Sequence, residues 1–530
     1  MTSKHITKNE LLLLCFLIIC FTLIFSFCSI ERHEAFCSRA WDLGIFNQTF
    51  WNIVHTGTQI NTLETAQVTF KLNYLNNLAY NTAIPTPQPA IPVNHLGVHF
   101  SLILYLFAPI YAIFQNPKTL LILQSFMVGL GVLPLYLIAK EKTQSIYFAL
   151  ILGICYLLYP AVYNITLFDF HELAFAPALI LFALYFLETR RYKYFWMFLA
   201  LSFFVKEDIA LSGIFIGLYI TLTKKEKKLG ALVSIVSLIY FIATIKIFMP
   251  FFGQPYNFTN RYLELTSSVH KGYFDIIYHV ATNPWNIFQF TFLDPRKIIY
   301  IADLFYPVIF LPFFSGFSFI LILPGLFVNL LSSYGSQYSV YYHYNGIIIP
   351  FIFFTAIIGY ANLQKRLPKS KYIILCLLAI TIVITSWSAF TRLSLYKNSL
   401  ISTISDKNQT LANILNEIPP SASVASTVNI VPHLTERKEI WLFPAINNAE
   451  YVLFEISEQA DYWPAGYINT FKLLTNLLEN KEYGILAATE NYILLKKGYD
   501  ISKNTNTLIR MKERFELIKE RRGITLFAPG

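Results

Sequence analysis

Long, almost uncharged hydrophobic runs recur along the chain from residue 11 to residue 390 and then stop. About 20 consecutive apolar residues are enough for a helix to cross the hydrocarbon core of a bilayer. The first run, Leu11–Ile30, has this length, and no small-residue cleavage site follows it, so we interpret it as an uncleaved anchor. The pattern predicts a polytopic α-helical membrane protein, with a transmembrane domain over residues 1–390 and a second domain over residues 391–530.

Short clusters of lysine and arginine separate the apolar runs. Cytoplasmic loops retain such residues, so each cluster predicts a cytoplasmic loop, and the number of crossings between successive clusters must be even. This rule predicts about eleven spans, a cytoplasmic N-terminus, a first external loop over residues 31–98 and an external C-terminal domain. The membrane is expected to be the plasma membrane of a bacterium. The clusters are Lys4 and Lys8; Lys140 and Lys142; Arg190, Arg191 and Lys193; Lys224–Lys228; and Lys365–Lys371.

Two apolar stretches lie between the first external loop and Lys140, but only one crossing is permitted there. The shorter stretch, Phe100–Phe114, contains Pro109 and is expected to lie in the outer leaflet, whereas Thr119–Ala139 crosses. Further spans are expected at Ser145–Tyr163, Leu173–Leu187, Leu229–Met249, 298–315, 316–333, Gly346–Tyr360 and Tyr372–Phe390.

The stretch YFWMFLALSFFVKEDIALSGIFIGLYITLT lies between two basic clusters and carries Lys206, Glu207 and Asp208 near its middle. One straight helix would bury three ionisable groups at the bilayer centre, at a cost of at least ~2.5 kcal/mol each. We therefore predict a hairpin of two short helices. Because its arms are shorter than a full span, its KED turn is expected below the outer membrane surface, in a protein-lined cavity.

The tail from residue 391 has short elements of both kinds. SVAST, EIWLF and YVLFE are typical of buried strands, whereas Gln409–Asn416 and Ile468–Leu478 are typical of helices. YGILAATENYILLKKG has two apolar runs around a polar TEN, which indicates a hairpin. The tail is therefore predicted to form an external α/β domain of roughly 140 residues, which is large enough to have its own core.

The composition agrees with a membrane protein. Hydrophobic residues make up 55% of the chain and charged residues only 14%, against roughly 25% charged in an average soluble domain. The net charge of +10 arises largely from the topological clusters, so it does not indicate nucleic acid. The sequence contains no nucleotide-binding glycine motif and no H-E-x-x-H, and its six cysteines imply no disulfide framework.

Five groups of ionisable residues fall on the predicted outer side. Charges at a membrane are functional candidates, because burying them is costly unless they pair or line a wet cavity. The motif DFHE also places two carboxylates and an imidazole within four residues, which suits acid–base work or a divalent ion. The groups are Asp42 with His55 in RAWDLGIFNQTFWNIVHTG; His95 with His99; Asp169, His171 and Glu172; Lys206, Glu207 and Asp208; and His343 among tyrosines.

Each group also has a purely structural interpretation. Asp42 and the DFHE carboxylates could cap helices, and the charges of KED could neutralise one another in a purely structural turn. His95 and His99, at i and i+4, would share one helix face as zinc ligands do, but Pro92 and Gly97 weaken a helix there. In the tail, VPHLTERKE is expected to close a helix and a turn.

Several motifs together resemble a known family in order and spacing. They are WDLGIFNQTFWN, NHLGVHFS, FDFHELAFAP, FVKEDIAL, the YHY loop and VPHLTERKEIWLFP. The resemblance is to the predicted membrane proteins of domain of unknown function 2079, which is similar to a distant branch of the GT-C membrane glycosyltransferases. It implies a catalytic acidic residue in the first external loop, membrane-surface helices before the second span and an external C-terminal domain.

The resemblance also implies roles for individual residues. Asp42 matches the first-loop acidic residue, although it stands alone where many relatives have adjacent acidic residues. Asp169 lies where many relatives carry a second acidic residue, and Lys206 lies near a basic residue that can face a lipid phosphate.

The implied reaction is transfer of a sugar from a polyprenyl phosphate at the outer face of the membrane. Asp42 would act as general base on an acceptor hydroxyl, and Lys206 with Arg261 would stabilise the leaving lipid phosphate. Asp169, His171 and Glu172 would position the acceptor or hold a divalent ion, the one cofactor considered, and Trp41 and Trp51 could stack on sugar faces. The other candidate substrate-binding residues are Gln48, His99, Glu207, Asp208 and His343.

Two other classes of protein fit the same residues. A transporter or flippase would use the buried charges as a proton-coupled path, and it predicts inverted repeats, which the sequence does not display. A non-catalytic scaffold would use its external domain to bind an envelope partner. Membrane lipids are expected partners in all three cases.

Overall fold

The computed structural model describes residues 6–64, 90–253, 261–262, 273–404, 407–443, 445–457, 460–462 and 467–521. The chain divides into two compact units. Unit 1 comprises residues 1–30, 96–107 and 120–397, and unit 2 comprises residues 31–95, 108–119 and 398–530. Unit 2 thus joins the first external loop to the tail, a grouping that the sequence patterns do not predict.

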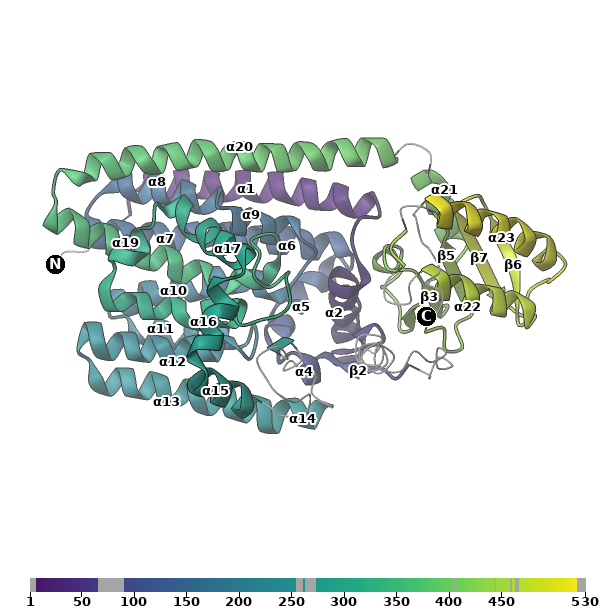
Figure 1. Ribbon diagram of the computed structural model, residues 1–530, viewed down its shortest axis with the longest axis horizontal. Helices are drawn as coiled ribbons and strands as arrows, with labels where there is room; N and C mark the ends of the chain where they lie inside the picture. Colours follow the sequence, from purple (N-terminus) through teal and green to yellow (C-terminus); the bar gives the residue numbers. More distant parts are fainter. Residues whose placement is uncertain are drawn as a thin grey trace. The chain divides into compact units, whose positions relative to one another are not determined.

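Unit 1 is helical, and Figure 1 shows its longer helices running in nearly the same direction. Four of the helices below, α1, α4, α6 and α20, begin or end in unit 2. The helices are α1 (Lys8–Glu34), α4 (His95–Val98), α6 (Pro117–Leu130), α7 (Val132–Thr143), α8 (Ile146–Leu157), α9 (Pro160–Leu167), α10 (Ala176–Glu188), α11 (Tyr192–Phe203), α12 (Ile209–Tyr219), α13 (Lys227–Ala243), α14 (Met249–Phe252), α15 (Tyr273–Thr282), α16 (Pro284–Phe292), α17 (Pro295–Phe305), α18 (Leu323–Leu330), α19 (Ile349–Arg366) and α20 (Ser370–Ile404).

Within the described residues, four helices are long and apolar enough to cross a membrane. They are Lys8–Glu34, Pro117–Thr143, Lys227–Phe252 and Ser370–Ser394, and the pair α8 and α9 makes a fifth if its 41° bend lies within one span. These helices confirm the apolar runs predicted to cross in the same places. The short α5 (Ile103–Ile113) contains Pro109, and a helix of its length does not reach across a bilayer.

The runs at 298–315 and 316–333, predicted as two spans, do not form two continuous α-helices. After α17, the chain forms short 3₁₀ turns at Tyr306–Val308, Leu311–Phe314 and Gly316–Ile322 before α18 begins. The backbones of Ile309 and Phe310 are left-handed, with φ of 46° and 56°. Proline lacks the N–H group that an α-helix interior needs, so the prolines within these turns favour interruption.

The predicted interruption at KED is confirmed. α11 ends at Phe203 and α12 begins at Ile209, with a turn between them that contains Lys206 and Glu207. α12 packs on α13 through small residues, because a Cβ atom at Gly217 would collide with Ser234 and with the backbone of Gly230. Close approach through small residues is typical of helices that associate in a membrane.

Unit 2 contains a five-stranded mixed sheet in the order β4-β3-β5-β7-β6. The central β3 pairs in parallel with β4 and β5, whereas β7 pairs antiparallel with both β5 and β6. All five predicted strands and both predicted helices of the tail are confirmed. The elements are β3 (Val424–Ser426), β4 (Ile440–Leu442), β5 (Tyr451–Glu455), β6 (Tyr483–Ala488), β7 (Tyr492–Lys497), α21 (Lys407–Asn416) and α22 (Tyr467–Glu479), followed by the unpredicted α23 (Asn504–Arg521).

Alternate residues of this sheet pack on two different layers, as the two-residue period of a strand requires. One face, which includes Val452 and Phe454, packs on α22 and α23 through residues such as Leu474 and Phe515, and Figure 1 shows both helices beside the strands. The other face packs on α21 and on residues of the first external loop. These are Ala40, Ile45 and Leu63.

The first external loop of unit 2 contains α2 (Ile45–Thr56) and a two-stranded pairing of β1 (Ile60–Asn61) with β2 (Val93–Asn94). The Gln48 side-chain amide donates to Thr62 Oγ1 at 2.9 Å and to the carbonyl of Lys438 at 3.2 Å. Its carbonyl accepts the Thr62 backbone N–H at 3.0 Å. Gln48 therefore holds the loop to the tail within unit 2, and its contact with a substrate stays a prediction.

Candidate functional site

The DFHE loop of unit 1 brings three ionisable side chains into the protein interior. α9 ends at Leu167, and the chain is extended at Phe168 and His171 before a 3₁₀ turn at Glu172–Phe175 leads into α10. Asp169, His171 and Glu172 are 1%, 6% and 0% exposed. Charges at this depth need compensating partners, so the neighbours of this loop define its chemistry.

Gln124, in the middle of α6, holds the DFHE loop in this conformation. Its side-chain amide donates to the carbonyls of Ile165, Thr166 and Phe168, and its carbonyl accepts the backbone N–H of His171 at 2.9 Å. The sequence interpretation did not single out this residue. A lone buried glutamine in an apolar run was the available signal.

The Glu172 carboxylate has two basic neighbours. Oε2 lies 2.8 Å from His171 Nδ1, and Oε1 lies 3.9 Å from Lys206 Nζ. The backbone N–H of Leu173 donates to His171 Nδ1 at 3.3 Å. Because Lys206 already faces this carboxylate, its charge opposes a divalent ion at Glu172.

Glu207 joins the KED turn to the start of α5. One carboxylate oxygen lies 3.0 Å from His99 Nδ1, and the other accepts the backbone N–H of Phe100 at 3.0 Å. Glu207 is 5% exposed, so these bonds compensate a buried group. His99 and Glu207 thus form a buried pair beside the Lys206 and Glu172 pair.

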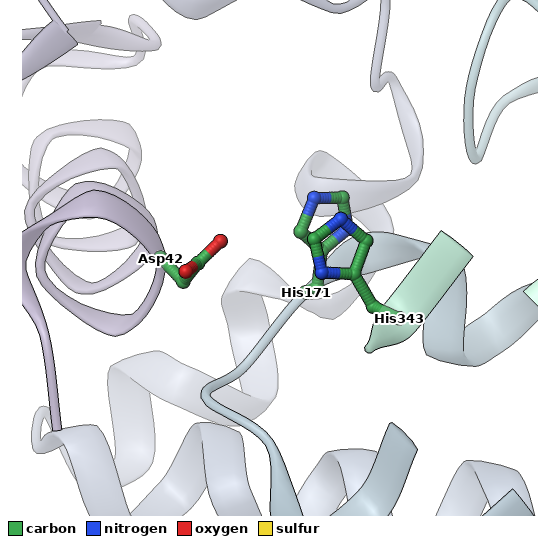
Figure 2. Close-up of side chains that lie close together, drawn as sticks. All are labelled: Asp42, His171 and His343. Carbon is green, nitrogen blue, oxygen red and sulfur yellow. The ribbon is translucent and has the colours of Figure 1, made fainter. Parts of the chain in front are cut away.

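His343 completes this group of side chains, which comprises His99, His171, Glu172, Lys206, Glu207 and His343 and is named the polar cluster below. Figure 2 shows the rings of His343 and His171 face to face, with centroids 3.6 Å apart and planes inclined by 15°. Gly346 permits this approach, because an added Cβ would lie 2.5 Å from the Leu173 carbonyl oxygen. Burial lowers the pKa of His343 well below its usual range, and the neighbouring His171 and Lys206 lower it further.

A cavity next to the polar cluster has Lys206, Asp208 and Arg261 in its wall. The Arg261 guanidinium lies over the rings of Tyr344 and Tyr334, at 5.4 and 5.8 Å from their centroids. Burial raises the pKa of Asp208 to about 7. The positive charge of Lys206 opposes this rise, whereas the negative charges of Glu207 and Glu172 add to it. The cavity wall therefore combines two cations with one carboxyl group.

Unit 1 thus brings together most of the predicted site residues from DFHE, KED, His99, Arg261 and the YHY loop. The structure gives no support to the zinc alternative, because α4 ends at Val98, before His99, and His95 and His99 have different carboxylate partners. His95 Nδ1 lies 2.7 Å from Glu64, whereas His99 pairs with Glu207.

The remaining predicted site residues belong to unit 2. Asp42 lies in a π-helical turn, Ala40–Gly44, and not at a helix N-cap, which Arg39 occupies. Asp42 is partly buried, as is Trp41. Trp51 stacks on His55, with ring centroids 4.0 Å apart. Figure 2 also labels Asp42, and its convergence with the polar cluster stays a prediction.

The fold is similar to that of a solved structure, ArnT. The structure of ArnT from Cupriavidus metallidurans bound to undecaprenyl phosphate matches at a TM-score of 0.51 and 11% sequence identity, covering 92% of this chain and 98% of that chain. The apo state of the same protein gives a TM-score of 0.46 and 11% identity, covering 91% of this chain and 97% of that chain. At this identity the likeness is one of fold.

The sequence itself identifies the family. A model of the predicted membrane protein family DUF2079 matches residues 32–494, so the chain belongs to that family. No curated protein matches the sequence.

Proposed function

We propose that this protein is a membrane glycosyltransferase that uses a polyprenyl-phosphate-linked sugar at the outer face of the membrane. The observation that carries the proposal is the cavity whose wall holds both Lys206 and Arg261, in a fold similar to that of ArnT. Two cations from separate segments suit a phosphate, because their charges attract it and their N–H groups can donate to its oxygens.

The cations would act on the leaving group. When the bond between the sugar C1 and the phosphate oxygen breaks, the electron pair goes to the lipid phosphate. Lys206 and Arg261 stabilise the charge that develops there. Glu172 orients Lys206 from within unit 1, at 3.9 Å, so the ammonium need not reorganise during the reaction.

Asp42 would be the general base, taking the proton from an acceptor hydroxyl as that oxygen bonds to C1. Its location in a π-helical turn supports this role, since such turns occur frequently at functional sites. The mechanism requires Asp42 and Lys206 to reach one substrate. Asp169 and His171 would position the acceptor, and Trp41 and Trp51 would contact the sugar.

The proposed topology has about eleven crossings, a cytoplasmic N-terminus and an external domain after residue 391. A reporter fused after Lys228 or Lys371 is expected to be cytoplasmic, and one fused after Ser421 external, because the basic clusters are retained inside. Paired alkaline phosphatase and fluorescent protein fusions measure this. A cytoplasmic reporter after Ser421 would contradict the assignment of the site to the outer face.

Deletion of the protein from its bacterium is expected to remove one envelope sugar modification and to leave the matching polyprenyl-phosphate sugar unconsumed. Mass spectrometry of envelope glycans and of lipid-linked sugars in the deletion and parent strains measures both. Re-expression of the intact chain should restore both profiles. An unchanged pair of profiles would exclude the proposed transfer.

A further inference from the structure

The cavity beside the polar cluster contains more than the two cations. It encloses about 40 Å³ of free space within unit 1, which corresponds to roughly three water-sized groups. Part of its wall is apolar and comes from α12, α18 and the residues before α10. The polar side chains that line it besides Lys206, Arg261 and Asp208 are Ser212, Asn329, Gln337 and Tyr344.

Three of these side chains have oxygen atoms that lack a hydrogen-bond partner among the described residues. They are Asp208 Oδ1, Ser212 Oγ and Gln337 Oε1, all buried. Ser212 and Gln337 are only 2% and 3% exposed. Most buried polar atoms in proteins are hydrogen-bonded, so three such oxygens in the wall of one small cavity indicate a ligand that donates hydrogen bonds.

Gln337 is held so that its carbonyl oxygen stays available. Its amide nitrogen donates to the Val328 carbonyl at 3.1 Å, which directs the other end of the amide away from that bond. Asn329 has a different role, since its amide nitrogen donates to Tyr300 Oη at 2.7 Å. Gln337 and Ser212 are therefore the side chains best suited to accept hydrogen bonds from a ligand.

The charges around the cavity decide which hydrogen-bond donors it can bind. The cavity wall holds two positive charges, Lys206 and Arg261, and the carboxyl group of Asp208, while the carboxylate of Glu172 lies 3.9 Å from Lys206 Nζ. An ammonium group placed there would be repelled by both cations at short range. Neutral hydroxyl groups satisfy the same oxygens without that cost.

We propose that this cavity recognises hydroxyl groups of an uncharged sugar next to the lipid phosphate, with Gln337 and Ser212 as specificity-determining residues. The proposal rests on the proposed function and deepens it, because it assigns the donor to neutral sugars and excludes amino sugars. The free space fits one hydroxyl-bearing edge of the sugar and not a whole ring.

The test measures binding of three probes to the purified full-length protein in lipid nanodiscs. The probes are a bare polyprenyl phosphate, the same lipid carrying glucose, and the same lipid carrying an amino sugar. We expect the glucose lipid to bind about 5–10-fold more tightly than the other two, which is the range that one or two neutral hydrogen bonds provide. Gln337→Leu should reduce this preference to less than about twofold.

Two further variants test whether a folding defect, and not the lost acceptor, explains a reduced preference. Gln337→Met and Ser212→Ala remove the same acceptors with smaller changes of shape. Ser237→Ala is the matched control, because Ser237 is also a buried helical serine but donates to the Val233 carbonyl within its own helix. The control should keep the full preference, and unfolding temperatures identify any variant that is not folded.

The outcomes separate the two proposals. Equal binding of glucose lipid and bare lipid, a preference for the amino sugar, or a preference that survives in all folded cavity variants would overturn the neutral-sugar inference alone. Failure to bind any polyprenyl phosphate would overturn the proposed function and the inference with it.

Discussion

Asp42→Asn is expected to lower sugar transfer by about 10²–10⁴-fold, the range that a positioned general base contributes. The asparagine keeps the size of the side chain but cannot accept the proton of the acceptor hydroxyl. Asp42 lies in the π-helical turn that begins at Ala40, whose backbone N–H donates to the Val428 carbonyl at 2.9 Å. This anchoring should leave the fold of the variant intact.

Transfer from polyprenyl-phosphate sugar to acceptor by the reconstituted full-length protein measures the effect. Asp461→Asn is the matched control, because Asp461 is a partly exposed carboxylate of the same unit that pairs with Arg39 at 3.4 Å. Exposed pairs contribute at most about 1 kcal/mol, so this variant should retain transfer. If Asp42→Asn is as active as Asp461→Asn, Asp42 is not the base.

The tail could be predicted in detail because its patterns are local. Tyr451–Phe454 is a short continuous apolar run, which is typical of a strand buried on both faces, and Val452 and Leu453 do face different layers. The KED interruption followed from an energetic argument, since three buried charges on one straight helix would be too costly. Both inferences needed only neighbouring residues.

The errors arose where tertiary contacts override local pattern. The apolar stretch after α17 has the composition of two spans, yet its prolines and the left-handed Ile309 and Phe310 break it into short turns. The role of Gln48 was similarly hidden, because its partners Thr62 and Lys438 lie 14 and 390 residues away along the chain.

The candidate site could be predicted as a list of residues but not as a set of pairs. His99 and Glu207 are 108 residues apart in sequence, whereas His95 lies only about one helical turn from His99 and raises zinc as an alternative. Likewise, DFHE alone suggests a divalent ion, whereas the approach of Lys206 to Glu172 supplies the positive charge from the protein itself. Only the fold decides between such alternatives.

Lys206→Met is expected to have the second large effect, a loss of transfer of about 10²–10³-fold, as when one stabilising donor of a transition state is removed. The same change leaves the fully buried Glu172 without its ammonium neighbour. Removing one partner of a buried pair costs about 3–5 kcal/mol, and His171 at 2.8 Å from Glu172 should keep the loss at the lower end. Activity and unfolding temperature must therefore be measured together.

The double variant Lys206→Met with Glu172→Gln separates the two effects. It removes both charges, so the unfolding temperature should recover towards that of the intact protein while transfer stays low. Lys140→Met is the matched control, because Lys140 is a partly buried lysine paired with Glu10 at 2.8 Å, and its loss should lower stability but not transfer. Recovery of transfer together with stability in the double variant would show that Lys206 neutralises Glu172 and does not act on the lipid phosphate.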